Sequence, residues 1–160
     1  MTDARFEDAP LSDQPLRLRA EGADDLAVIS CLLQDAVGKP TDIAWMPKKR
    51  RLVALLNRFR WEDSADAQQA HRPFERVRSA VTVESVLSVR ARGLALDGKE
   101  QVFDLLAILF EPADGCAGTL TLTLAGNAEI AIEVECLELT LADLTRPWEA
   151  KTNQVPEHGE

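Results

Sequence analysis

The stretch RVRSAVTVESVLSVRAR, residues 76–92, decides the fold because small or apolar side chains alternate in it with polar ones. The first set falls at every second position and comprises Val77, Ser79, Val81, Val83, Ser85, Leu87, Val89 and Ala91. A period of two predicts a β-strand with one face on a core. Since seventeen residues exceed the usual strand length, we expect a bulge or a break near Glu84–Ser85.

Further strands are predicted on both sides of this stretch. The segments that alternate, or form short apolar runs between turn residues, are 16–20, 43–46, 103–110, 119–124 and 130–136. Residues 52–61 fit either a helix or a buried strand, and the nearby Pro47 favours a strand hairpin with 43–46. The dipeptide Gly126-Asn127 predicts a tight hairpin turn.

One main helix is predicted at about 24–37, where Leu26, Ile29 and Leu33 recur at helical spacing. Asp24 or Asp25 would cap its start, and Gly38 followed by Pro40 would end it. A short helical turn is expected at 141–144. The short connections between strands predict an α+β fold: a curved, mainly antiparallel sheet or partly closed roll of about seven strands, with the helix packed on it or filling one end.

Length and composition indicate one folded domain. Of the 160 residues, 46% are hydrophobic and 28% charged, which excludes a wholly disordered chain. We expect a flexible acidic arm at 1–14, a single domain at 15–148 and a flexible tail at 149–160. The net charge of −9 argues against a general nucleic-acid or membrane-surface binder. No signal peptide or long apolar run is recognised, so a cytoplasmic protein is expected.

Catalytic and metal motifs are not recognised in the sequence. It has no GxGxxG, HExxH or GxSxG pattern, and two histidines with three scattered cysteines give no zinc spacing. We therefore predict no cofactor and no metal, and we favour a protein that is not an enzyme. Cys31 and Cys136 are interpreted as small core residues, and Cys116, in the loop ADGCAG, as an exposed thiol.

Charge is unevenly distributed along the chain. Residues 45–92 hold eleven Lys or Arg and five acids, so this segment carries +6 and the remainder −15. If 52–61 and 76–92 are neighbouring strands, several arginines share one face and could grip phosphate or carboxylate groups. The alternative, which we favour, is that these arginines pair with acids outside the segment as surface ion pairs.

These features lead to three hypotheses of function. The first is a non-catalytic binding or adaptor domain for a protein or an acidic small molecule, with a contact surface formed by Asn57, Arg58, Arg60, Trp61, Arg90 and Arg92. The second is an enzyme whose site is assembled from Asn57, Glu62, Arg90 and Cys116. The third, RNA binding through the basic segment 45–92, is disfavoured by the charge of the remainder.

Several segments, in order, resemble one family. They are LQDAV (33–37), DIAWMPKKRRL (42–52), LNRFRWE (56–62), Arg92-Gly93, LLAILFEP (105–112), IEVECLELTLADL (132–144) and Pro147-Trp148. Together they cover about residues 15–150 and resemble the uncharacterised bacterial family called domain of unknown function 2948. The resemblance implies a small cytoplasmic bacterial protein. It implies no activity and no site residues.

Overall fold

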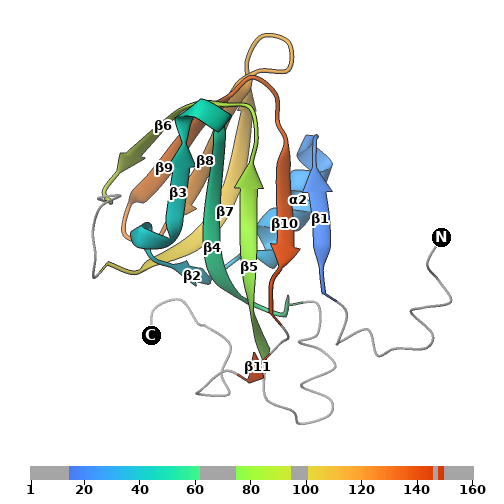
Figure 1. Ribbon diagram of the computed structural model, residues 1–160, viewed down its shortest axis with the longest axis vertical. Helices are drawn as coiled ribbons and strands as arrows, with labels where there is room; N and C mark the ends of the chain where they lie inside the picture. Colours follow the sequence, from blue (N-terminus) through green and yellow to red (C-terminus); the bar gives the residue numbers. More distant parts are fainter. Residues whose placement is uncertain (1–14, 62–74, 95–100, 146–147, 150–160) are drawn as a thin grey trace, which may run out of the picture.

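The computed structural model describes residues 15–61, 75–94, 101–145 and 148–149. In this part of the chain the strands form one antiparallel 11-stranded sheet in the order β1-β10-β5-β4-β2-β7-β8-β9-β6, with β3 paired to β4 and β11 to β5 (Figure 1). The strands are β1 (Arg17–Ala20), β2 (Ala36–Gly38), β3 (Ile43–Met46), β4 (Arg51–Phe59), β5 (Glu75–Val83), β6 (Val86–Arg92), β7 (Phe103–Pro112), β8 (Gly118–Leu124), β9 (Ala128–Val134), β10 (Leu139–Asp143) and β11 (Trp148–Glu149). The helical elements are α2 (Ala23–Leu32) and the short turns η2 (Pro40–Asp42) and η3 (Pro47–Lys49).

The sheet is open and strongly curved. β5 leads into β6 after two residues, yet the two strands lie far apart in the strand order, so the sheet bends over itself. One layer contains β1, β10, β5 and β4, and the other contains β7, β8, β9 and β6 (Figure 1). This confirms the predicted class and the curved antiparallel sheet. The predicted number of strands was too low because 76–92 divides into β5 and β6, and because the short strands β2, β10 and β11 were not predicted.

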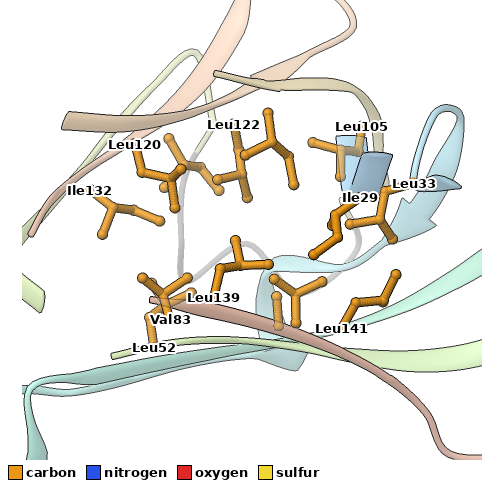
Figure 2. Packing of buried hydrophobic residues seen from close by; sticks show 14 of the residues in the cluster. Ile29, Leu33, Leu52, Val83, Leu105, Leu120, Leu122, Ile132, Leu139 and Leu141 are labelled. Atoms are coloured by element: carbon orange, nitrogen blue, oxygen red, sulfur yellow. The ribbon is translucent and has the colours of Figure 1, made fainter. Parts of the chain in front are cut away.

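The core lies between the two layers and is made of aliphatic side chains. Figure 2 shows leucine, isoleucine and valine residues of β4, β5 and β10 facing those of β7, β8 and β9. Ile29 and Leu33, within and just after α2, fill one end of this core (Figure 2). The helix therefore closes an end of the roll, as predicted.

The predicted break in the long alternating stretch lies at Glu84 and Ser85. Ser85 has φ 58°, in the left-handed region, and it separates β5 from β6. The register of β6 with β9 then shifts between Val86 and Ser88. Because both irregularities move the phase of the alternation, Leu87 is 51% exposed and Val86 is buried. The predicted inward direction of Leu87 was therefore wrong.

Helix α2 is shorter than the predicted helix 24–37. It begins after Gly22 and ends at Leu32, and Asp35 has φ 65°, which reverses the chain. Residues 36–38 instead form β2, which joins β4 to β7. Gly38 is not a helix cap: a Cβ there would lie 2.6 Å from the Leu56 side chain, so glycine permits close packing.

Two further details of the predicted helices were also wrong. Asp24 and Asp25 lie in the first turn of α2 and do not cap it with their side chains, although they favour the positive end of the helix dipole. Residues 141–144 form no helical turn, because β10 runs to Asp143 between β1 and β5. There the alternation of Leu139 and Leu141 places both side chains in the core.

The remaining predictions on organisation concern parts of the chain outside the described residues. These are the acidic arm at 1–14 and all but the first residue of the tail at 149–160. Within the described ranges, no helix has the length and apolar character needed to cross a membrane.

Candidate functional site

Arg58, one of the six predicted binding residues, lies on the core face of β4 and is 0% exposed. Its guanidinium donates two hydrogen bonds to Asp143 of β10, from Nε to Oδ1 at 3.0 Å and from Nη2 to Oδ2 at 2.9 Å. The same carboxylate accepts hydrogen bonds from the Ser79 hydroxyl at 2.7 Å and the Leu16 backbone N–H at 3.0 Å. Four donated bonds compensate the buried carboxylate, so this group joins strands and presents no surface to a ligand.

Arg60 and Trp61 follow at the end of β4 and are also engaged. Arg60 is 6% exposed and forms an ion pair with Glu75 on β5. The Trp61 indole N–H donates to the Gln34 carbonyl oxygen at 2.9 Å, and its ring centroid lies 5.8 Å from that of Phe59. Trp61 thus links the end of β4 to the turn after α2.

Arg90 and Arg92 lie on β6, at the far end of the strand order. Arg90 pairs with Glu133 at 3.3 Å, and Arg92 pairs with Glu129 at 3.1 Å, both across the β6–β9 ladder. They are well separated in the sheet from the β4 residues, so the structure does not bring the six residues together in one surface. A binding role for any of them stays a prediction.

The residues of the hypothetical enzyme site are likewise spread over the fold. Asn57 lies on β4, where its side-chain oxygen accepts a hydrogen bond from Arg78 at 3.2 Å. Arg90 lies on β6 and Cys116 lies in the loop between β7 and β8. Glu62 lies outside the described residues.

Carboxylates pair with seven of the described arginines of the basic segment 45–92. The ion pairs within the described ranges include Arg50–Glu135, Arg51–Glu84, Arg58–Asp143, Arg60–Glu75, Arg78–Asp42, Arg90–Glu133 and Arg92–Glu129. Five of these seven acids come from outside the segment, which is the pairing that the sequence analysis favoured. An RNA or another polyanion would have to displace these carboxylates.

A different feature, a surface cavity of about 610 Å³, is formed where five segments meet; we call it the end cavity. It is lined by the start of α2, the β5–β6 break, the end of β7, the β7–β8 loop and the segment after β9. These segments converge at the upper end of the sheet in Figure 1. Phe110, Pro112 and Leu137 give the cavity apolar walls.

Polar groups also line the end cavity. Glu21 and Glu138 line it, and both form ion pairs with Arg19, at 3.0 Å in the case of Glu21. Because one guanidinium faces two carboxylates, this group of three carries one net negative charge. Gly22 and Ala23, where α2 begins, follow Glu21 in the lining.

Two thiols also line the end cavity, Cys116 and Cys136. Their interaction, together with burial and the negative charges of Glu135 and Glu138, raises the pKa of the Cys136 thiol. Cys116 is exposed, as predicted, whereas Cys136 is only half-buried, in a bend after β9, and is not a core residue. Cys31 is exposed on α2, and its predicted place in the core was therefore wrong.

The sequence contained a signal for this pair that the sequence analysis missed. Cys116 and Cys136 are each ten residues from Gly126, the centre of the predicted hairpin turn. The β8–β9 register follows the same symmetry and pairs Gly118 with Val134 at the end of the ladder. Extending a hairpin from its turn would have placed the two cysteines opposite each other.

Metal binding is not indicated by the described residues, which contain no group of three or more His, Cys, Asp or Glu side chains placed to hold an ion. A family model described as "Protein of unknown function (DUF2948)" matches residues 16–158. No curated protein and no solved structure matches the chain.

Proposed function

Because the chain belongs to the DUF2948 family, whose description names no activity, we propose from the structure that it is a non-catalytic binding domain that holds a small ligand in the end cavity. The observation that carries the proposal is the cavity of about 610 Å³, since ligand sites in proteins commonly enclose about 300–1,000 Å³. Its mixture of apolar walls and a few polar groups is also typical of such sites.

The lining favours a ligand with an apolar body and a cationic, hydrogen-bond-donating end. Phe110, Pro112 and Leu137 would contact the apolar part. Glu21 and Glu138 would accept hydrogen bonds from an ammonium group, and the net negative charge that they share with Arg19 would attract it. An arylalkylamine, which carries an ammonium group on an alkyl chain attached to an aromatic ring, combines both parts. This class differs from the acidic partner expected from the arginines, because those side chains are held by carboxylates.

Nuclear magnetic resonance of the ¹⁵N-labelled full chain tests the proposal with phenethylamine as the probe. We expect the amide signals of Ala23, Cys116 and Leu137 to shift as the amine is added. The isosteric carboxylate 3-phenylpropanoate should shift them less, because it meets Glu21 and Glu138 with a like charge.

Two variants of α2 provide the matched comparison. Ala23→Phe places a large ring at the wall of the end cavity and should abolish the shifts. Val28→Phe adds the same ring at an exposed position on a different face of the helix and should leave them unchanged. Equal shifts with both probes, or shifts that survive Ala23→Phe, would overturn the proposal.

A further inference from the structure

The two thiols of the end cavity belong to segments that the β8–β9 hairpin brings side by side. The ladder ends at Gly118 and Val134, and each cysteine lies two residues beyond it along the chain, outside the strands. Continued past the end of the ladder, the same register would bring Cys116 opposite Cys136. Both line the same cavity and their side chains interact.

The end of the ladder brings the two segments close to the spacing that a disulfide needs. Opposite residues of antiparallel strands have Cβ atoms about 4.5–5.5 Å apart, and a disulfide brings them to about 3.5–4.5 Å. Neither cysteine is inside the ladder: Cys116 is in the turn at 113–117, closed by the Ala113 N–H donating to Ala117 at 2.7 Å, and Cys136 is in a bend. A small closing movement would therefore break no hydrogen bond of the β8–β9 ladder.

We propose that Cys116 and Cys136 are a redox modification site, which a peroxide converts reversibly into a disulfide that narrows the end cavity. The disulfide would tie the β7–β8 loop to the segment after β9 across the wall of the cavity. Its effect on binding rests on the proposed function, whereas its formation does not.

The reaction has two steps. The Cys116 thiolate attacks hydrogen peroxide, the O–O bond breaks, and Cys116 sulfenic acid forms with release of one water molecule after protonation. Cys136, as its thiolate, then attacks the Cys116 sulfur; the S–S bond forms, the S–O bond breaks, and hydroxide leaves as a second water molecule. In sum, two thiols and one peroxide give one disulfide and two water molecules.

The order of the two cysteines follows from their surroundings. Cys116 is exposed on its loop, so peroxide reaches its sulfur. Cys136 is half-buried in its bend, so peroxide reaches its sulfur less readily. Cys116 is thus the attacking cysteine and Cys136 the resolving one.

Mass spectrometry of the full chain after treatment with hydrogen peroxide tests the disulfide. Cleavage after glutamate, which does not occur before Pro112, releases Cys116 in residues 101–129 and Cys136 in residues 136–138, so a disulfide joins two otherwise separate peptides. We expect this linked product from the wild type and from Cys31→Ser, and none from Cys116→Ser or Cys136→Ser. Dithiothreitol should reverse it. Wild-type protein in which both cysteines stay unlinked would overturn the proposal.

The effect of the disulfide on ligand binding is measured separately, by the shifts of the amide signals that phenethylamine causes. The oxidised wild type should show several-fold weaker shifts than the reduced protein, and oxidised Cys136→Ser should bind as the reduced protein does. A disulfide that forms without weakening these shifts would refute the regulation and leave the proposed cavity intact. If the amine does not bind the reduced protein, the proposed function fails, and the peptide analysis alone decides the disulfide.

Discussion

Two regions of the same sheet use arginine–carboxylate pairs in opposite settings. Between β4 and β10, the side chains of Arg58 and Asp143 are 0% and 4% exposed. Between β6 and β9, those of Arg92 and Glu129 are 74% and 36% exposed. The two pairs differ in exposure because the arginine lies on the core face of its strand in one pair and on the solvent face in the other. Arg58 is in phase with the buried residues of β4, whereas Arg92 points away from the core.

The comparison shows that the same pair of side chains has a different energetic role in each region. The buried pair loses its hydration on folding, so its net contribution depends on complete hydrogen bonding, which Ser79 and Leu16 help to supply. Removing one partner leaves an uncompensated charge in the core. The exposed pair keeps most of its hydration and gains little, so removing a partner costs little.

The largest effect is expected for Arg58→Ala. It leaves the carboxylate of Asp143 without its cation in the core, and we expect it to lower the free energy of unfolding by about 3–5 kcal/mol. Urea unfolding followed by circular dichroism measures the loss. Asp143→Ala should cost a similar amount, because it leaves the guanidinium of Arg58 buried without its acceptor.

The double variant Arg58→Met/Asp143→Leu is the control for this prediction. It removes both charges and keeps the volume apolar, so it should be more stable than either single variant. It should remain below the wild type, because the Ser79 hydroxyl and the Leu16 N–H lose their acceptor. A double variant that loses as much as the two single variants together would show that the charges are not coupled.

A smaller effect is expected for Ser79→Ala, which removes one of the donors to Asp143 and leaves the ion pair in place. Because the lost bond is to a charged acceptor in the core, we expect a loss of about 1–3 kcal/mol in the same urea experiment. Ser88→Ala on β6 is the matched control and should stay within about 0.5 kcal/mol of the wild type. Equal losses of unfolding free energy in Ser79→Ala and Ser88→Ala would contradict a specific contribution of the hydrogen bond from Ser79 to Asp143.

The alternation of apolar and polar residues predicted most of the sheet. The prediction failed at a residue with a positive φ, where the chain reverses. The faces of β5, β8 and β9 follow the pattern of their sequence, as does the break at Glu84–Ser85. Residues 36 and 37 were predicted to be helical because apolar spacing does not reveal the reversal at Asp35. Contacts with residues distant in sequence determine the structure at such positions, and a local sequence pattern carries no information about these contacts.

The buried arginine shows the same limit for the candidate sites. Leu52, Ala54, Leu56 and Arg58 share one face of β4, so the sequence already placed this arginine in phase with the core. Its partner Asp143 was hidden by the predicted helical turn at 141–144. The cavity could not be predicted, because five separate segments form it and no single one of them carries a recognisable motif.

The smallest effect is expected at the exposed pair, where Arg92→Ala and Glu129→Gln should each change the free energy of unfolding by less than about 1 kcal/mol. A double-mutant cycle over both residues isolates their coupling, which should be about 0.2–1 kcal/mol in low salt and should vanish in 1 M sodium chloride because solvent ions screen exposed charges. The same cycle over Arg58 and Asp143 should keep most of its coupling in high salt, since ions do not reach a pair that is 0% and 4% exposed. If salt weakens both couplings in proportion, burial does not distinguish the two regions, and the arginine of β4 is in contact with solvent.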